Sequence, residues 1–337
     1  MIRIALDGFG SDSAPEPEIM GALSAVESND DLEIIIAGDE AVLNNAIKKN
    51  NYNGSRIKVV NAPERITMDD SPSSIVRNKK NSSMRIAYEL VKNREADAII
   101  SAGNSGASLA IAMFVFKRIK GIDRPAIATI MPAMGGYTVL IDAGANVDVK
   151  PYHLAEFAIM GAEYASFMKG INNPKVGLLS NGEESSKGND LTREAFVLIK
   201  NTDLNFYGYV EGREIFNGKV DVVVCDGFTG NVILKAAETL AETIFNLLKE
   251  EINKSLTAKL GFFMARKSLK KFKKLVDHNE YGGAPLLGVN GPVFIAHGGA
   301  SAKALTSAIL VAKHFVEKGI IVNISNKIES NAKNICE

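Results

Sequence analysis

Two stretches of the chain share a design that restricts the possible folds more than any other feature. The apolar run from Val176 ends in a polar turn that contains Lys187, and a helical pattern follows it. Further along, the apolar run from Val220 to Cys225 ends in a glycine turn before another helical pattern. In α/β proteins, a strand, a glycine turn and a helix place unpaired backbone N–H groups around an anion. We therefore expect such turns to meet at one anion site, with Lys187 directed into it.

The alternation of β-rich runs with stretches of helical period continues along the chain and predicts an α/β fold with a largely parallel sheet. The expected strands cover residues 3–6, 32–37, 57–61, 98–101, 126–131, 138–141, 175–179, 204–209, 220–225 and 293–296. The expected helices cover residues 16–26, 40–49, 82–94, 105–117, 152–168, 191–200, 231–253 and 302–318. No linker rich in proline or glycine divides them. We predict one doubly wound, Rossmann-like α/β/α domain over residues 1–337, with a protruding basic amphipathic helical element near 255–278.

Composition excludes several classes of protein. Lys+Arg and Asp+Glu both total 39, and this zero net charge argues against a general nucleic-acid binder. Two cysteines give no disulfide framework and fit a reducing cytoplasm. The four histidines lack metal-type spacing, so we expect no structural zinc. We see neither a signal peptide nor an apolar run of about 18 residues that could span a bilayer, and we expect a cytoplasmic protein.

Other strand ends carry further candidates for an anion site. The turn after strand 98–101 contains Asn104, Ser105 and Gly106, small residues at a helix N-terminus that offers N–H donors. An acyl-serine at Ser105 is disfavoured, because the turn is not G-x-S-x-G and no histidine is near it in sequence. Asn146 follows strand 138–141, where it either faces the site or caps a turn.

The first turn and the last strand add two more candidates. Gly10 belongs to a GxGxx turn after the first strand, which invites a dinucleotide interpretation. Ser13 in the third glycine position and two nearby acids that would repel a pyrophosphate argue against it and favour a tight turn. His297 ends strand 293–296 before two glycines, the same kind of position that Lys187 and Asn231 occupy. A structural and a functional role both remain open for it.

Residues 254–276 form a basic segment in a neutral protein. The segment has eight lysines and arginines and no acid, interleaved with apolar side chains at helical spacing. Such a helix can pack its apolar stripe on the core or on a second subunit, or it can dock on an anionic membrane surface or an acidic partner protein. The residues expected to dock are Leu260, Phe262, Phe263, Arg266, Lys267, Lys270 and Lys271.

The residues alone indicate an α/β enzyme that handles phosphate or a phosphoester. Ten segments, taken in order along the chain, make this functional interpretation more specific. They are Asp7 to Pro15, NAPERITMDDSP from Asn61, KKNSSMRIAYELVK from Lys79, SAGNSGA from Ser101, GIDRPAIAT from Gly121, DAGANVDVKP from Asp142, NGEESSKGNDLT from Asn181, VEGREIF from Val210, VVVCDGFTGNVILK from Val222 and EYGGAPLLGVNGPVFIAHG from Glu280. Together they resemble the bacterial phosphate acyltransferase family over nearly the whole chain.

The resemblance implies transfer of a fatty acyl group from acyl carrier protein to inorganic phosphate, which gives acyl phosphate for phospholipid synthesis and free carrier protein. It also implies a fold related to phosphotransacetylases and isopropylmalate-type dehydrogenases. The protein is then expected to be a homodimer without metal or cofactor, attached peripherally to the inner face of the cell membrane. Its carrier-protein partner is acidic, so part of the basic segment is also a candidate for docking it.

The family's motifs fall on particular residues of this chain. Its Lys-Gly-Asn turn falls on Lys187-Gly188-Asn189 and its Gly-Phe-x-Gly-Asn turn on residues 227–231, which implies that Lys187 and Asn231 hold the thioester carbonyl and the phosphate. The expected catalytic residues are Lys187, Asn231 and His297. The residues expected to bind phosphate or the thioester are Gly10, Asn104, Ser105, Gly106, Asn146, Asn181, Gly188, Asn189 and Gly230.

Two departures from the family pattern are visible. In the first turn, Phe9, Ser11 and Ser13 replace the usual Met, second Gly and His, which excludes a catalytic histidine there. After His297 the chain has Gly298-Gly299-Ala300 where the family usually has Gly-Ser-Ser, so hydroxyl contacts at that point are in doubt. Three other functions remain open: a phosphotransacetylase that uses acyl-CoA, an NAD-dependent hydride-transfer enzyme, and a non-catalytic membrane-associated scaffold.

Overall fold

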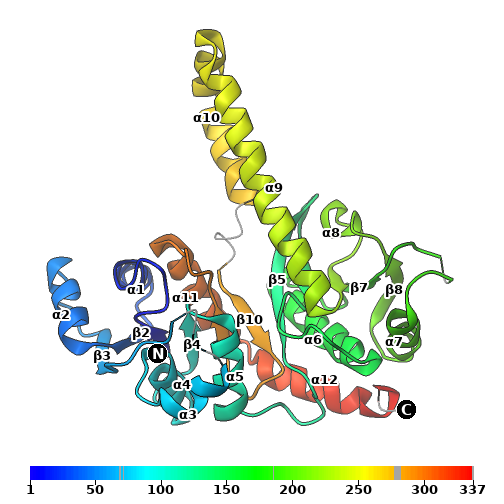
Figure 1. The fold of residues 1–337 in the computed structure, drawn as a ribbon, viewed down its shortest axis with the longest axis horizontal. Helices are drawn as coiled ribbons and strands as arrows, with labels where there is room; N and C mark the ends of the chain where they lie inside the picture. Colours follow the sequence, from blue (N-terminus) through cyan, green and yellow to red (C-terminus); the bar gives the residue numbers. More distant parts are fainter. Residues whose placement is uncertain (68–69, 71, 185, 277–281, 336–337) are drawn as a thin grey trace.

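One mixed sheet organises the computed structural model, which describes residues 1–67, 70, 72–184, 186–276 and 282–335. The described strands pair in the order β3-β2-β1-β4-β11-β10-β5-β6-β9-β7-β8. They are β1 (Ile2–Asp7), β2 (Leu32–Gly38), β3 (Ile57–Asn61), β4 (Ala98–Ser101), β5 (Ala126–Ala133), β6 (Gly136–Ile141), β7 (Lys175–Leu179), β8 (Asn205–Val210), β9 (Val222–Val224), β10 (Ala284–Leu287) and β11 (Val293–Ile295). The predicted α/β class with mostly parallel pairing is confirmed (Figure 1).

The sheet consists of two parallel halves that run in opposite directions. β1, β2, β3, β4 and β11 are parallel to one another, and β10 is antiparallel to both β11 and β5, so β5 runs with this half. β6 is antiparallel to β5, and β9, β7 and β8 follow the direction of β6. The reversal is a tight hairpin at Gly135, whose φ of 79° suits glycine. The carboxyl ends of the two halves therefore face opposite edges of the sheet.

Helices cover both faces because side chains on successive strand residues point to opposite sides. On one face, Ile4 and Leu6 of β1 share a core with α1 (Glu16–Ser28), α2 (Glu40–Lys49), α6 (Pro151–Lys169), α7 (Asp190–Lys200), α11 (Ala302–Glu317) and α12 (Ile320–Ile335). On the other, Ala5 packs with α3 (Pro72–Asn78), α4 (Ser83–Lys92) and α5 (Ser105–Val115). Further along that second face, Leu140 and Val223 pack with α8 (Glu214–Asn217) and the start of α9 (Gly227–Asn253).

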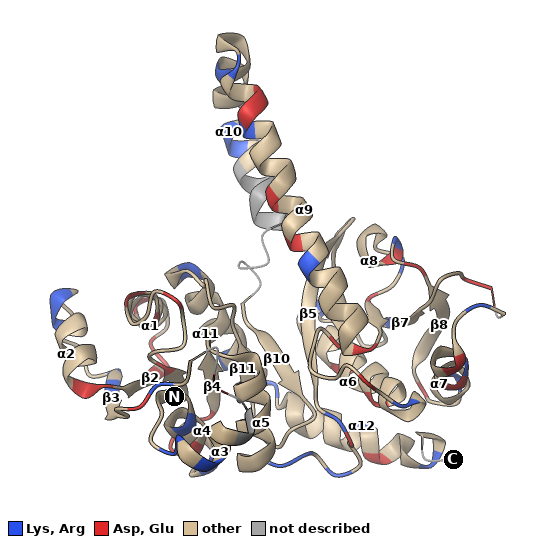
Figure 2. Cartoon of the chain, viewed as in Figure 1, with Lys and Arg blue, Asp and Glu red and all other residues tan. Residues whose placement is uncertain are grey.

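α9 and α10 (Leu256–Val276) pack against each other and project from the body of the molecule (Figure 1). The described part of α10 carries Lys and Arg residues (Figure 2). Phe262 is 41% exposed and Phe263 is 68% exposed, and Leu260, Arg266 and Lys267 are also exposed. The side chains of Lys270 and Lys271 lie outside the described part, as do residues 277–281. Among the described helices, none has the length and apolar character needed to cross a bilayer.

Candidate functional site

A cavity of about 180 Å³ lies on the face of the sheet that α5 and α9 cover. Its floor is Ile127 and Thr129 of β5, the strand at which the direction of the sheet reverses. Ser105 comes from the start of α5, Asn231 from the start of α9, and His297 from the end of β11. The remaining lining residues are Ala143, Leu234, Lys235, Glu238, Gly282, Gly283, Ala284, Ile295, Ala296, Ala300 and Ala304. Both halves of the sheet thus contribute polar groups to one cavity.

The turn between β4 and α5 sets the position of Ser105. Asn104 is the N-cap of α5, and its Oδ1 accepts the N–H of Ala107 at 3.0 Å. Ser105 and Gly106 consequently form the first turn of the helix. A Cβ at Gly10 would lie 2.8 Å from the backbone nitrogen of Ala102. Gly10 therefore permits close packing of the first loop against this turn, and it does not line the cavity.

The start of α9 sets the position of Asn231. The helix begins at Gly227, not at residue 231 as the sequence suggested, because Asp226 caps it and accepts the N–H of Thr229 at 2.8 Å. The N–H of Gly227 is donated to the carbonyl of Asn146 and that of Gly230 to the carbonyl of Asp226. These N–H groups are already bonded within the protein. These two N–H groups therefore do not point to an anion.

A buried carboxylate supports the start of α9. Asp142 is fully buried after β6, and its two oxygens accept N–H groups from Ile127, Gly144, Ala145 and Asn146. Burial raises the pKa of Asp142, and these hydrogen bonds oppose the rise. The Asn146 amide donates to the Pro125 carbonyl and to Asp142 at 2.7 and 2.9 Å. Asn146 therefore lies in a buried network behind the cavity wall rather than in the wall itself.

Lys187 lies in the loop after β7, the strand next to β9. Its side chain is exposed and is not among the residues that line the cavity. Asn181 Oδ1 accepts the N–H of Gly188 at 2.9 Å, and Asn189 caps α7. The structure thus brings Ser105, Asn231 and His297 together at the cavity, and it places these loop residues outside it.

Glu183, an acid of the same loop, forms ion pairs with two basic side chains. Glu183 lies 2.9 Å from Lys219 Nζ and 3.4 Å from Arg213, and its hydrogen bond with Lys219 lowers the pKa of Glu183. Both of these basic partners of Glu183 are on the neighbouring segment after β8. Orientation of Lys187 by Glu183 receives no support from these contacts.

His297 is held by the glycines that follow it. Its Nδ1 accepts the N–H of Gly299 at 3.0 Å, so the proton of the neutral ring is on Nε2. The first loop braces this turn, because Asp12 donates its N–H to the carbonyl of Gly298 at 2.8 Å. Behind the loop, burial raises the pKa of Glu18 to about 7, and Glu18 accepts the N–H of Ser11.

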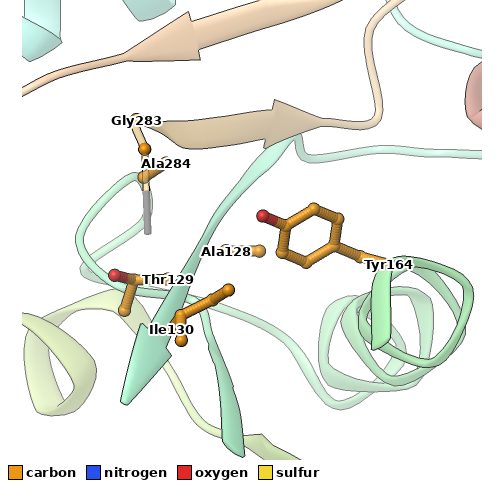
Figure 3. A pocket seen from close by; sticks show the side chains of 7 residues that line it. Ala128, Thr129, Ile130, Tyr164, Gly283 and Ala284 are labelled. Atoms are coloured by element: carbon orange, nitrogen blue, oxygen red, sulfur yellow. The ribbon is translucent and has the colours of Figure 1, made fainter. Parts of the chain in front are cut away.

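A smaller cavity of about 20 Å³ adjoins the first and shares Thr129 and residues 282–284 with it. Tyr164 projects into it from α6, opposite Ala128 and Ile130 of β5 (Figure 3). This volume holds roughly one water molecule. Pockets that enclose drug-sized ligands measure about 300–1,000 Å³. The two cavities are therefore large enough for reacting groups and too small for a long acyl chain.

Comparison with known proteins gives consistent results. A family model described as "Fatty acid synthesis protein" matches residues 2–323. The phosphate acyltransferase of Geotalea uraniireducens is 53% identical over 330 residues, which cover 98% of this chain and 95% of the relative. The phosphate acyltransferase of Geobacter sulfurreducens is 52% identical over 329 residues, with the same coverage. The chain belongs to the phosphate acyltransferase family. It is an acyltransferase, and the resemblance found in the sequence is confirmed.

Solved structures support the fold of this phosphate acyltransferase family member. A phosphotransacetylase from Streptococcus pyogenes has a TM-score of 0.66 at 20% identity, and the match covers 94% of each chain. A phosphotransacetylase from Staphylococcus aureus has a TM-score of 0.63 at 20% identity and covers 93% of this chain and 94% of its own. The predicted relation to the phosphotransacetylase fold is confirmed.

Two cavity residues of this acyltransferase escaped the sequence analysis. Lys235 and Glu238 lie on α9 after Asn231, and Lys235 Nζ is 3.0 Å from Glu238 Oε2. In sequence they look like an ordinary ion pair on the solvent face of a helix. Their spacing from Asn231 could have identified them, because residues four and seven positions after Asn231 lie on the same face of a helix as Asn231.

Proposed function

We propose that the protein transfers a fatty acyl group from the thioester of acyl carrier protein to inorganic phosphate. The observation that carries this proposal is the convergence of Ser105, Asn231 and His297 on one cavity in a member of the phosphate acyltransferase family. The description of the matching family model, fatty acid synthesis, supports a fatty acyl donor. The products are acyl phosphate, which serves phospholipid synthesis, and the free thiol of the carrier protein.

The proposed reaction needs little activation of its acceptor. An oxygen of hydrogenphosphate forms a bond to the thioester carbonyl carbon, and the C–S bond breaks with its electron pair leaving on sulfur. The proton of hydrogenphosphate ends on the thiol, so atoms and charge balance. The Asn231 amide and the Ser105 hydroxyl can donate hydrogen bonds to the carbonyl oxygen as negative charge develops on it. The Nε2–H of His297 can donate a hydrogen bond to the departing sulfur, while the proton that the thiol keeps comes from hydrogenphosphate.

Phosphate-dependent release of carrier-protein thiol tests the function directly. We expect palmitoyl carrier protein to release thiol when phosphate is added, and we expect acetyl-CoA to react poorly. The likeness to phosphotransacetylase structures favours the second candidate, an enzyme that uses acyl-CoA. Faster turnover of acetyl-CoA than of palmitoyl carrier protein would establish that candidate instead.

Lys187 is proposed to offset the charge that develops on the attacked carbonyl. Its loop follows β7, which is parallel to the adjacent β9, so it lies at the same edge of the sheet as the start of α9. We expect Lys187→Ala to lower kcat by about 100-fold, the usual loss when one group that stabilises the oxyanion is removed. Steady-state kinetics on variant protein with an unchanged circular dichroism spectrum measures this, and a near-normal kcat would remove Lys187 from the catalytic set.

The exposed apolar and basic side chains of α10 are proposed to bind an anionic membrane on the cytoplasmic side. Phe262 and Phe263 can enter the interface while Arg266 and Lys267 meet lipid phosphates. We expect the double variant Phe262→Asp, Phe263→Asp to stay in the supernatant when anionic vesicles are sedimented with it. Unchanged co-sedimentation of the double variant would refute membrane binding by α10. If the double variant also loses activity toward acyl carrier protein in the absence of vesicles, α10 docks the carrier protein instead.

A homodimer is proposed to cover the apolar side of α9. Leu240, Ile244 and Leu247 are 60%, 54% and 57% exposed and recur at helical spacing. Monomeric proteins rarely leave such a stripe in water. Sedimentation velocity is expected to give a dimer for the wild type and a monomer for Ile244→Asp. A wild-type monomer at micromolar concentration would contradict the proposal.

A further inference from the structure

The cavity contains a charged group that the mechanism above does not use. Lys235 lines it together with Asn231, which precedes Lys235 by one helical turn on the same side of α9. Of the described residues that line the cavity, Lys235 alone carries a permanent positive charge. Lys187, the lysine singled out in the sequence, does not line it.

Glu238 keeps the ammonium group of Lys235 close to the helix. The two side chains are 3.0 Å apart at three-residue spacing, and Glu238 is the less exposed partner at 17% against 52% for Lys235. A lysine tethered in this way loses less side-chain freedom when an anion binds. Ser105, in the first turn of α5, also lines the cavity, and the helix dipole at that end favours negative charge.

We propose that Lys235 binds the phosphate acceptor and that Glu238 positions it, which gives the phosphate subsite of the function proposed above. Phosphate then lies beside Lys235 on α9, over Thr129 on the floor of the cavity, and the Ser105 hydroxyl stays with the carbonyl oxygen. Asn231 is one turn closer to the start of α9, where the thioester carbonyl can lie within reach of the phosphate. The two lysines have separate roles, with Lys235 binding the acceptor and Lys187 acting on the carbonyl.

Kinetics in which each substrate is varied separately test the assignment. Lys235→Gln is expected to raise the KM for phosphate by about 10- to 100-fold, the loss expected for one charge-assisted hydrogen bond. The KM for palmitoyl carrier protein should change by less than about twofold. Lys235→Arg should recover most of the loss because it keeps the charge. Lys249→Gln, an exposed lysine on the same helix outside the cavity, is the matched control.

Phosphate binding without an acyl donor gives a second measurement that does not depend on turnover. Inorganic phosphate should raise the Tm of the wild type and of Lys249→Gln, and it should not raise that of Lys235→Gln. An exposed helix pair contributes little to stability, so the variant is expected to fold.

Two results would overturn the assignment: a KM for phosphate unchanged in Lys235→Gln, or a Tm shift by phosphate that is the same in variant and wild type. Absence of any Tm shift in the wild type at millimolar phosphate also counts against it. If the wild type releases no thiol while phosphate still protects it through Lys235, the proposed function fails and the phosphate subsite stands.

Discussion

Replacing Asn231 with alanine is expected to lower kcat by about 100- to 1,000-fold, the range seen when one preorganised donor to an oxyanion is removed. The reason is the position of Asn231. It lines the cavity together with Ser105 and His297, and it lies at the start of α9, a helix end that Asp226 caps. Because the donor acts mainly on charge that develops during reaction, the KM values for both substrates should change far less than kcat.

Asn246→Ala is the matched control for this prediction. Asn246 lies on the same helix and is exposed to solvent, and it is not among the residues that line the cavity. Its kcat should equal that of the wild type. If Asn231→Ala were equally active, the oxyanion would have to be stabilised elsewhere, and Ser105 and Lys187 would be the next residues to replace.

Replacing Gly230 with alanine is expected to destabilise the fold by about 3 kcal/mol or more, at the upper end for overpacked sites. A Cβ at this position would lie 1.9 Å from the carbonyl oxygen of Asp142. That oxygen belongs to a backbone segment that the hydrogen bonds of the Asp142 carboxylate hold in place. Neither this segment nor the start of α9 can therefore shift without a loss of stability. The free energy of unfolding in urea measures the loss, and activity should fall with it because Asn231 is displaced.

Gly261→Ala provides the contrasting substitution for the stability measurement. Gly261 lies within α10, and a Cβ there would meet no atom within 4 Å. Alanine is favoured over glycine in a helix by about 1 kcal/mol, so this variant should be as stable as the wild type or slightly more stable. Equal losses in the two variants would show that general helix effects, rather than the contact with Asp142, determine the result.

The sequence is sufficient to predict most of the sheet because its buried parallel strands are short, continuous apolar runs. β1, β2, β4 and β7 were expected within one or two residues of where they lie. β10 was missed because Ala284–Leu287 contains a proline and follows two glycines, a pattern typical of a turn. α12 was missed because polar side chains interrupt it, although Ile320, Ile324 and Ile328 recur at helical spacing.

The candidate site was harder to predict because it depends on how the two halves of the sheet meet. The glycines at 227 and 230 suggested a loop, yet they lie in a helix whose backbone closely approaches Asp142 and Asn146. The reversal between β5 and β6 had a local signal, since Gly135 and Gly136 separate two apolar runs. The prediction from sequence did not include this reversal. It therefore placed Lys187 and His297 at one site and did not foresee a cavity that Lys187 does not line.

The length of α9 fixes how far the chemistry lies from whatever α10 binds. Glu238 is the last residue of α9 that lines the cavity and the helix continues to Asn253, so at about 1.5 Å per residue the arm extends about 22 Å beyond the cavity. A protein that rests on a surface by the far end of this arm holds its cavity away from that surface by about four turns of helix. Shortening α9 by whole turns would bring the cavity closer to that surface by about 5.4 Å per turn.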